Sequence, residues 1–165
     1  LLGSALGRTY DRRRAFALFD RAEALMQPAP ALTDMLTRFR AETFERDGQK
    51  ERSDALYYQL WTERNRFDLL GRIWEHYNDT ERAEKDEAYA RRSRFITVLF
   101  ATEYLARPKR DAKLMSFLNT QLNKFVSDMF FRQTKQLPTL APDGKVGVCT
   151  EEQLHTLMSR LQGVR

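Results

Sequence analysis

The sequence has little of what disulfide scaffolds, zinc sites and membrane spans require. Among its 165 residues it contains one cysteine, Cys149, and two histidines, His76 and His155, which lie far apart. One cysteine excludes an internal disulfide framework and a cysteine-rich metal site. The two histidines lack the spacing with other ligands that binds zinc. No apolar run approaches the roughly 20 residues that cross a bilayer.

Residues that favour β-strands are also scarce. Isoleucine occurs twice, at Ile73 and Ile96, and valine is rare, whereas Leu, Ala, Arg, Glu, Phe and Met are plentiful. This balance favours helices over strands. With 42% hydrophobic residues the chain can bury a core, and its length suits one domain. We therefore predict an all-α fold.

Apolar residues at helical spacing predict six helices, which end at proline, glycine or polar turns. Their expected ranges are 10–26, 32–46, 51–77, 81–106, 111–134 and 150–163. The third and fourth are joined by a short polar turn and should form a long antiparallel hairpin over about 51–106, with flanking helices. We expect a helical domain over 1–137, and a loop plus a short C-terminal helix over 138–165. The loop contains the turn signal Asp143-Gly144.

Recognisable motifs of catalysis and cofactor binding are absent from the sequence. The sequence has no nucleotide-binding loop, no His-Glu zinc helix and no Gly-x-Ser-x-Gly elbow. The nearest approach to a metal-binding pattern is "WEHYNDTE" at 74–81, which is better explained as a helix end followed by a helix cap. We therefore predict a protein that is not an enzyme and that has no cofactor, no metal and no catalytic residue.

The net charge of +5 is unevenly distributed. Residues 41–87 hold eight cations and thirteen anions, whereas residues 88–137 hold ten cations and three anions. Arginine, which outnumbers lysine, offers a planar fork that pairs with phosphate and carboxylate groups. The basic segment therefore predicts a negatively charged partner, either outside the chain or within it.

Two basic stretches are candidates for RNA binding. Arg12, Arg13 and Arg14 lie at an expected helix start, where cations oppose the helix dipole unless a partner holds them. In "ARRSRFITVLFATEYLARPKR", at 90–110, a cationic cluster stands at each end of an apolar stretch; it contributes the candidates Arg91, Arg92, Arg94, Lys109 and Arg110. The alternatives are intramolecular pairs: the first stretch with Asp11 and nearby acids, and the second with Glu75, Glu81, Glu84 and Glu87.

Two segments resemble the mitochondrial form of the large-subunit ribosomal protein twenty-nine family. "LYYQLWTERNRFDLL", at 56–70, is similar to the first long helix of that family, with its leucine, aromatics and Glu-Arg-Asn in order. "RRSRFITVLFATE", at 91–103, is similar to its second helix. The resemblance covers about 50–105 and implies a helical hairpin on ribosomal RNA near the peptide exit tunnel. It also implies that Arg64, Asn65 and Thr97, together with the three arginines at 91, 92 and 94, face RNA or a neighbouring ribosomal protein.

The predicted function is a non-catalytic structural subunit of a mitochondrial ribosome, on the matrix side, with rRNA and ribosomal proteins as partners. The first ten residues contain Arg8 and no acid, which is typical of the end of a cleaved presequence. The alternative is an accessory structural subunit of a mitochondrial membrane complex, such as a respiratory complex or ATP synthase. Such a subunit would be held by protein–protein contacts, and its exposed aromatics Phe117, Phe130 and Phe131 should form one patch. A free-standing helical regulator or binding protein is a third possibility, and an enzyme is the last.

Overall fold

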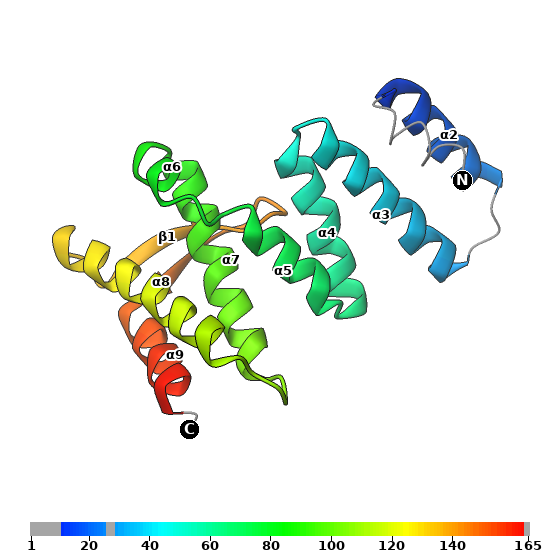
Figure 1. Cartoon of the computed structure of the whole chain (residues 1–165). Coiled ribbons are helices and arrows are strands. Elements are labelled where there is room, and N and C mark those ends of the chain that lie inside the picture. The colour runs from blue at the N-terminus through cyan, green and yellow to red at the C-terminus, as the bar shows by residue number, and fades with distance from the viewer. Residues whose placement is uncertain (1–10, 26–28, 164–165) are drawn as a thin grey trace. The chain divides into compact units, whose positions relative to one another are not determined.

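The computed structural model describes residues 11–25 and 29–163, and this part of the chain is predominantly α-helical (Figure 1). The predicted all-α class is therefore confirmed. The basic stretch at the extreme N-terminus, with Arg8, lies outside the described residues. The helices are α2 (Arg12–Leu25), α3 (Pro30–Arg46), α4 (Lys50–Arg64), α5 (Phe67–Glu75), α6 (Thr80–Lys85), α7 (Glu87–Leu105), α8 (Ala112–Phe131) and α9 (Glu151–Gly163).

The expected helix over 51–77 is divided at Asn65 into α4 and α5. Asn65 has a left-handed backbone, with φ 51° and ψ 41°, and its N–H donates to the carbonyl of Trp61 at 2.7 Å. Asparagine tolerates this conformation better than most residues and commonly ends helices. The prediction of one unbroken helix was therefore wrong, although the gap between α4 and α5 is short.

The expected helix over 81–106 is likewise divided, at Asp86. Its backbone is extended, with φ −128° and ψ 100°, so it ends α6 and begins α7. Its carboxylate accepts the backbone N–H of Tyr89 at 3.1 Å, which is the interaction of an N-cap. Each arm of the expected hairpin over 51–106 therefore contains a break.

The chain divides into two compact units, residues up to Ile73 and residues from Trp74 onward. This is not the division at residue 137 that the sequence predicts. In the first unit, Ala15 and Phe19 of α2 and Leu36 of α3 form a buried cluster. α3 in turn packs most extensively on α4, where Tyr57 is fully buried and donates its hydroxyl to Glu45 at 3.0 Å. Three consecutive helices therefore supply most of this unit's core.

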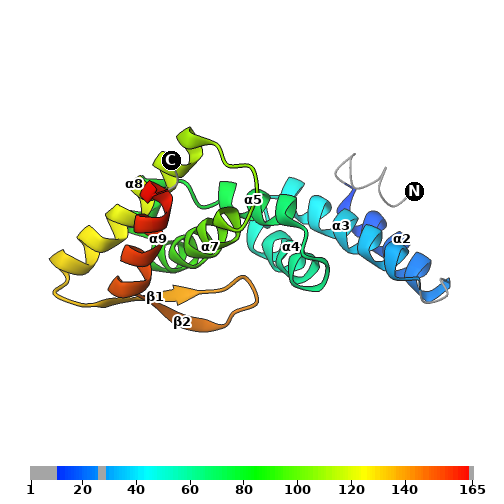
Figure 2. The same ribbon diagram turned by 90° about the horizontal axis from the view of Figure 1, so that it is seen from below.

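The second unit is built around α7, much of which is buried. α8 packs along α9, and a two-stranded sheet packs on α7 (Figure 2). The sheet consists of β1 (Gln136–Leu140) and β2 (Val146–Thr150), an antiparallel hairpin that turns through Asp143-Gly144. The prediction of a loop here was wrong, whereas the expected C-terminal helix is present as α9, and Thr150 caps it by accepting the N–H of Gln153 on its Oγ1 at 3.2 Å.

Candidate functional site

Arg94, a predicted RNA contact, is buried in the second unit with 3% of its surface exposed. Its guanidinium donates to Glu87 at 3.0 Å, to Asp128 at 3.3 Å and to the carbonyl of Pro138 at 3.1 Å. A charge can be buried when it is paired and hydrogen-bonded in this way. The prediction that Arg94 faces RNA is therefore wrong, because its donors are directed at the protein's own acceptors.

The other predicted contacts on α7 are also drawn into the fold. Thr97 is 2% exposed, so it cannot face RNA. Arg91 lies 3.5 Å from the Glu87 carboxylate, one helical turn away, and Arg92 is half-buried. Intramolecular pairing, the alternative stated for this stretch, thus holds for Arg91 and Arg94, with Glu87 as the shared acid.

Lys109 and Arg110 behave differently, because they lie in the connection between α7 and α8. This basic connection, residues 107–113, is exposed throughout and also contains Arg107 and Lys113. Arg110 donates to the backbone carbonyl of Leu105 at 3.2 Å, a neutral acceptor, and has no ion pair with a carboxylate in the part of the chain that is described. Phosphate contact therefore stays a prediction for Lys109 and Arg110.

Two of the predicted contacts of the first unit, Arg12 and Arg64, are held by acids. Arg12 pairs with Asp47, and Arg64 donates to Asp34 at 2.7 Å. Arg13 and Arg14 are exposed at the start of α2. Asn65 caps α4 through its backbone, as described above. The structure brings Arg64 together with Arg38 and Arg66 around a cavity of about 350 Å³ in this unit. Each of these three arginines has its own carboxylate partner.

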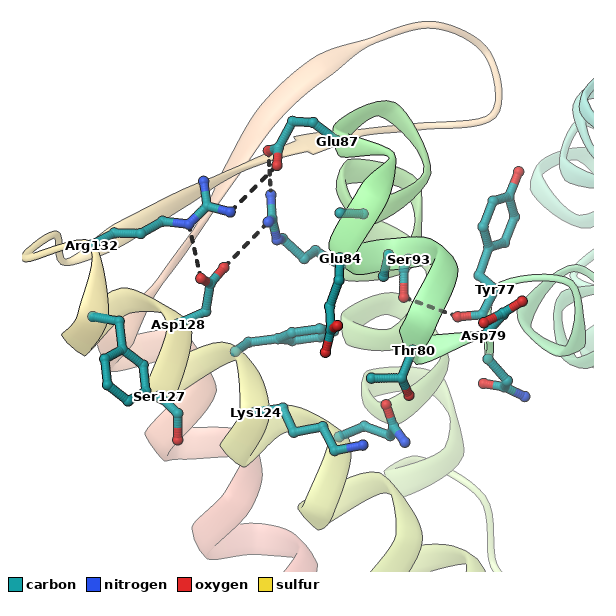
Figure 3. Close-up of a pocket in the computed structure, with 17 residues that line it drawn as sticks. Tyr77, Asp79, Thr80, Glu84, Glu87, Ser93, Lys124, Ser127, Asp128 and Arg132 are labelled. Carbon is teal, nitrogen blue, oxygen red and sulfur yellow. Dashed lines mark hydrogen bonds and ion pairs between the residues drawn. The ribbon is translucent and has the colours of Figure 1, made fainter.

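A groove of about 580 Å³ lies in the second unit. One wall is α6 with the start of α7, and the other is the C-terminal half of α8 (Figure 3). The capping aspartates hold the first wall in place: Asp79 accepts the N–H of Arg82 at 3.0 Å, and Asp86 caps α7. Tyr89 links them, since its hydroxyl donates to the His76 carbonyl at 2.9 Å and accepts from the N–H of Asp79 at 3.1 Å.

One end of the groove is closed by Glu87, Arg94, Asp128 and Arg132, here named the four-charge cluster. Arg132 donates to Asp128 at 2.8 Å and to Glu87 at 3.4 Å, so each arginine contacts both carboxylates (Figure 3). Burial by itself raises the pKa of Glu87. The hydrogen bonds and charges of Arg94 and Arg132 lower this pKa by a larger amount, so it lies below its ordinary value. The cluster balances its own charge and joins α7 to α8.

The rest of the groove is open to a ligand. Phe125 and Phe131 of α8, with Ala83 and Ala90 opposite, give it apolar walls, and Phe131 is 82% exposed. Glu84 and Lys124 extend into it from opposite walls (Figure 3). Within the described residues neither of these two side chains has an ion pair. The groove therefore offers an apolar surface with one negative and one positive group beside it.

Sequence reasoning found neither the groove nor its charge cluster. Asp128 and Arg132 lie 34 and 38 residues beyond Arg94, and nothing in local spacing indicates that α8 crosses α7 at this point. In the part of the chain that is described, no three side chains are placed to hold a metal ion, and no helix is long and apolar enough to span a membrane. Comparison with family models, curated proteins and solved structures gave no match.

Proposed function

We propose that this chain is a non-catalytic structural subunit that binds an amphipathic helix of a partner protein in the groove between α6, α7 and α8. The observation that carries the proposal is the exposed apolar wall around Phe131, with Glu84 and Lys124, which have no ion pair among the described residues, on either side of it. Helix-in-groove binding uses apolar anchors at spacings of three and four residues.

The size of the groove suits this ligand. Its α8 wall runs from Gln121 to Arg132, which at 1.5 Å per residue is roughly 16 Å, or three helical turns. A bound helix would place large apolar side chains against Phe125 and Phe131. It would place a cation near Glu84 and an acid near Lys124. Because opposite charges stand on the two walls, these groups also fix the direction of the bound helix.

This mode of binding is what an accessory subunit of a larger complex requires. A respiratory complex or ATP synthase was the alternative drawn from the sequence, and a mitochondrial location on the matrix side remains part of this proposal. The expected single patch of Phe117, Phe130 and Phe131 does not form, however. Phe117 lies thirteen residues before Phe130 on α8, roughly 20 Å away, and packs edge-on against Trp74. The groove, rather than an aromatic patch, carries the proposed contact.

Phe130 and Phe131 provide a matched test. Both are about four-fifths exposed, at 79% and 82%, but only Phe131 lines the groove. A tagged chain is expressed in its source cells and its sedimentation in a density gradient is followed. We expect the parent chain and Phe130→Asp to travel with a large assembly, and Phe131→Asp to remain in the light fractions. Equal behaviour of the two variants would contradict binding in the groove.

A second candidate function is binding to RNA, as in the mitochondrial ribosome, and the exposed basic connection favours it. The test is the affinity of the purified chain for RNA as a function of salt, with Lys109→Gln/Arg110→Gln beside the control Arg91→Gln/Arg92→Gln. If the connection contacts phosphates, loss of two contacts should reduce the salt slope by about 1.4 for single-stranded RNA, at roughly 0.7 per contact. The control should leave the slope nearly unchanged.

A further inference from the structure

The β1–β2 hairpin has one edge whose backbone groups point away from the fold. Hydrogen bonds frame the hairpin at both ends, from Ala141 N–H to Lys145 O and from Glu151 N–H to Lys135 O, each at 2.9 Å. In an antiparallel pair, hydrogen-bonded and non-hydrogen-bonded positions alternate. Pro138 and Val148, which stand opposite each other, therefore form a non-hydrogen-bonded pair.

The same alternation places Val146 and Thr150 in non-hydrogen-bonded pairs. The N–H and C=O groups of Val146 and Val148 and the N–H of Thr150 consequently point out of the hairpin, along the free side of β2, whereas the carbonyl of Thr150 begins the hydrogen bonds of α9. Val146 and Val148 are 74% and 53% exposed. Within the described residues, no backbone hydrogen bond outside the hairpin reaches either valine. This free side is here named the β2 edge.

The opposite edge, on β1, is closed. Pro138 has no N–H to donate, and its carbonyl, which points away from β2, accepts from Arg94 at 3.1 Å. Proteins usually protect exposed strand edges with proline, lysine or a bulge. β2, with the sequence Val-Gly-Val-Cys-Thr, has none of these within its length. One edge of the hairpin is thus protected and the other is competent to pair.

We infer that the β2 edge pairs with the β2 edge of a second copy of this chain, antiparallel about a two-fold axis at Val148. The sequence Lys145–Glu151 is self-complementary in this register. Val148 stands opposite Val148 of the second copy, and Val146 stands opposite Thr150, so β-branched side chains meet on one face. At each end Lys145 stands opposite Glu151, which pairs opposite charges.

Geometry allows this register because only outward-pointing residues can form the new hydrogen bonds. Val148 would bond with its own counterpart through both of its backbone groups, and the N–H of Thr150 would donate to the Val146 carbonyl at both ends, which extends two strands to four. Such a symmetric contact closes on itself and gives a dimer, not a fibre. Two five-residue strands form an interface below the roughly 1,200 Å² of stable complexes, so the dimer should be weak and concentration-dependent.

This inference is independent of the groove, since none of the groove's lining residues belongs to β2. It is tested by sedimentation equilibrium of the purified chain from about 5 to 500 µM. We expect reversible dimerisation in this range. Val148→Lys, which places a charge at the two-fold axis, should be monomeric, and Val148→Thr, which stays β-branched, should dimerise.

Charge reversal provides the sharper test of the register. Lys145→Glu places two acids opposite each other at both ends, and Glu151→Lys places two bases there, so each variant alone should dimerise about tenfold more weakly. An equimolar mixture of the two variants restores an opposite-charge pair at each end, and should recover the dimer. Circular dichroism confirms that each variant is folded.

Three results would overturn the inference. The parent chain could remain monomeric at the highest concentration, which would exclude a second copy of the chain as the partner of the β2 edge. Val148→Lys could dimerise as well as the parent, which would place the dimer contact elsewhere. The mixture of the two charge variants could stay as weakly associated as its components, which would exclude the proposed register.

Discussion

Replacing Arg94 with methionine should destabilise the second unit, because it removes a guanidinium that three acceptors share. The side chain of Arg94 is 4% exposed, and it contacts Glu87, Asp128 and the carbonyl of Pro138. Methionine has a similar length and fills most of the same space, so loss of packing is a small part of the effect. What remains is the loss of charge-assisted hydrogen bonds in a partly buried site.

The magnitude follows from what each partner retains. Removing one member of a buried ion pair costs about 3–5 kcal/mol. Here the carboxylates are 42% and 32% exposed, and both keep Arg132. Solvent and the second arginine should therefore reduce the electrostatic loss to about 2 kcal/mol. The Pro138 carbonyl, which no longer has a donor, adds about 1 kcal/mol. We expect a total of about 3 kcal/mol.

The assay is urea unfolding at neutral pH, followed by tryptophan fluorescence in a Trp61→Phe background. Trp74 then reports on the second unit, where it stacks on Phe100 at 4.5 Å. Arg132→Met is the matched control, because Arg132 is 47% exposed and its loss should cost about 1 kcal/mol or less. The role of the cluster is refuted if the free energy of unfolding of Arg94→Met lies within about 0.5 kcal/mol of that of its parent. It is also refuted if Arg94→Met is more stable than the control Arg132→Met, because the cluster would then not hold α7 to α8.

Three further predictions concern other positions. The pKa of Glu87 lies below its ordinary value of about 4.3, so Glu87 should contribute its full stabilisation above roughly pH 5. This stabilisation should be lost as the pH falls from the ordinary pKa toward the lower pKa of the folded state. The free energy of unfolding of Glu87→Gln should therefore depend less on pH in this range. Because Asn65 has a positive φ, Asn65→Ala should cost about 1 kcal/mol in thermal or urea unfolding and Asn65→Gly less than half of that. Burial raises the pKa of the Cys149 thiol, which is 1% exposed, so iodoacetamide should alkylate it more than about tenfold faster in urea than in the native chain, as measured by mass spectrometry.

Helix existence could be predicted from the sequence, whereas helix breaks could not. The ranges expected for α3, α8 and α9 agree with the structure within a few residues, because apolar periodicity and turn residues mark their ends. Asn65 and Asp86 are each one residue within an otherwise helical pattern. Their types are compatible with a left-handed cap and an N-cap, but polar residues of this kind are common on helix surfaces. Tertiary packing decided which of them ends a helix.

The two strands were not predicted from the sequence, for a different reason. The turn Asp143-Gly144 was recognised, and Gly144 has the positive φ of 89° that such a turn needs. The flanking segments are five residues long, and Pro138 argues against a strand in the middle of a sheet. In a two-stranded sheet both strands are edge strands, and an edge strand tolerates that proline. Two short strands packed on α7 are enough to form this sheet. In the structure Leu137 and Thr139 are buried at alternate positions, but Thr139 is polar, so the sequence does not show this alternation as a pattern of apolar residues.

The candidate site could not be predicted because its charges come from distant segments. The sequence showed correctly that the region 88–137 is rich in cations, but pairing depends on which acids α8 brings to α7. Glu87 was named as a possible partner, and it does pair with Arg91 and Arg94. Asp128 was not, since it lies 34 residues from Arg94. Resemblance to the ribosomal family stays a prediction, although the burial of Arg94 and Thr97 removes two of the contacts that it implied.

The contacts of Arg94 also bear on how the chain is made. During synthesis Arg94 leaves the ribosome well before its acceptors, since Asp128 follows 34 residues later and Pro138 follows 44 residues later. At about 5–20 residues per second, several seconds separate these events. In that interval Glu87 is the one member of the four-charge cluster that a nascent α7 can offer this guanidinium. α7 should therefore dock stably only after the β1–β2 hairpin emerges, so residues 136–150 are required before α7 can complete its packing.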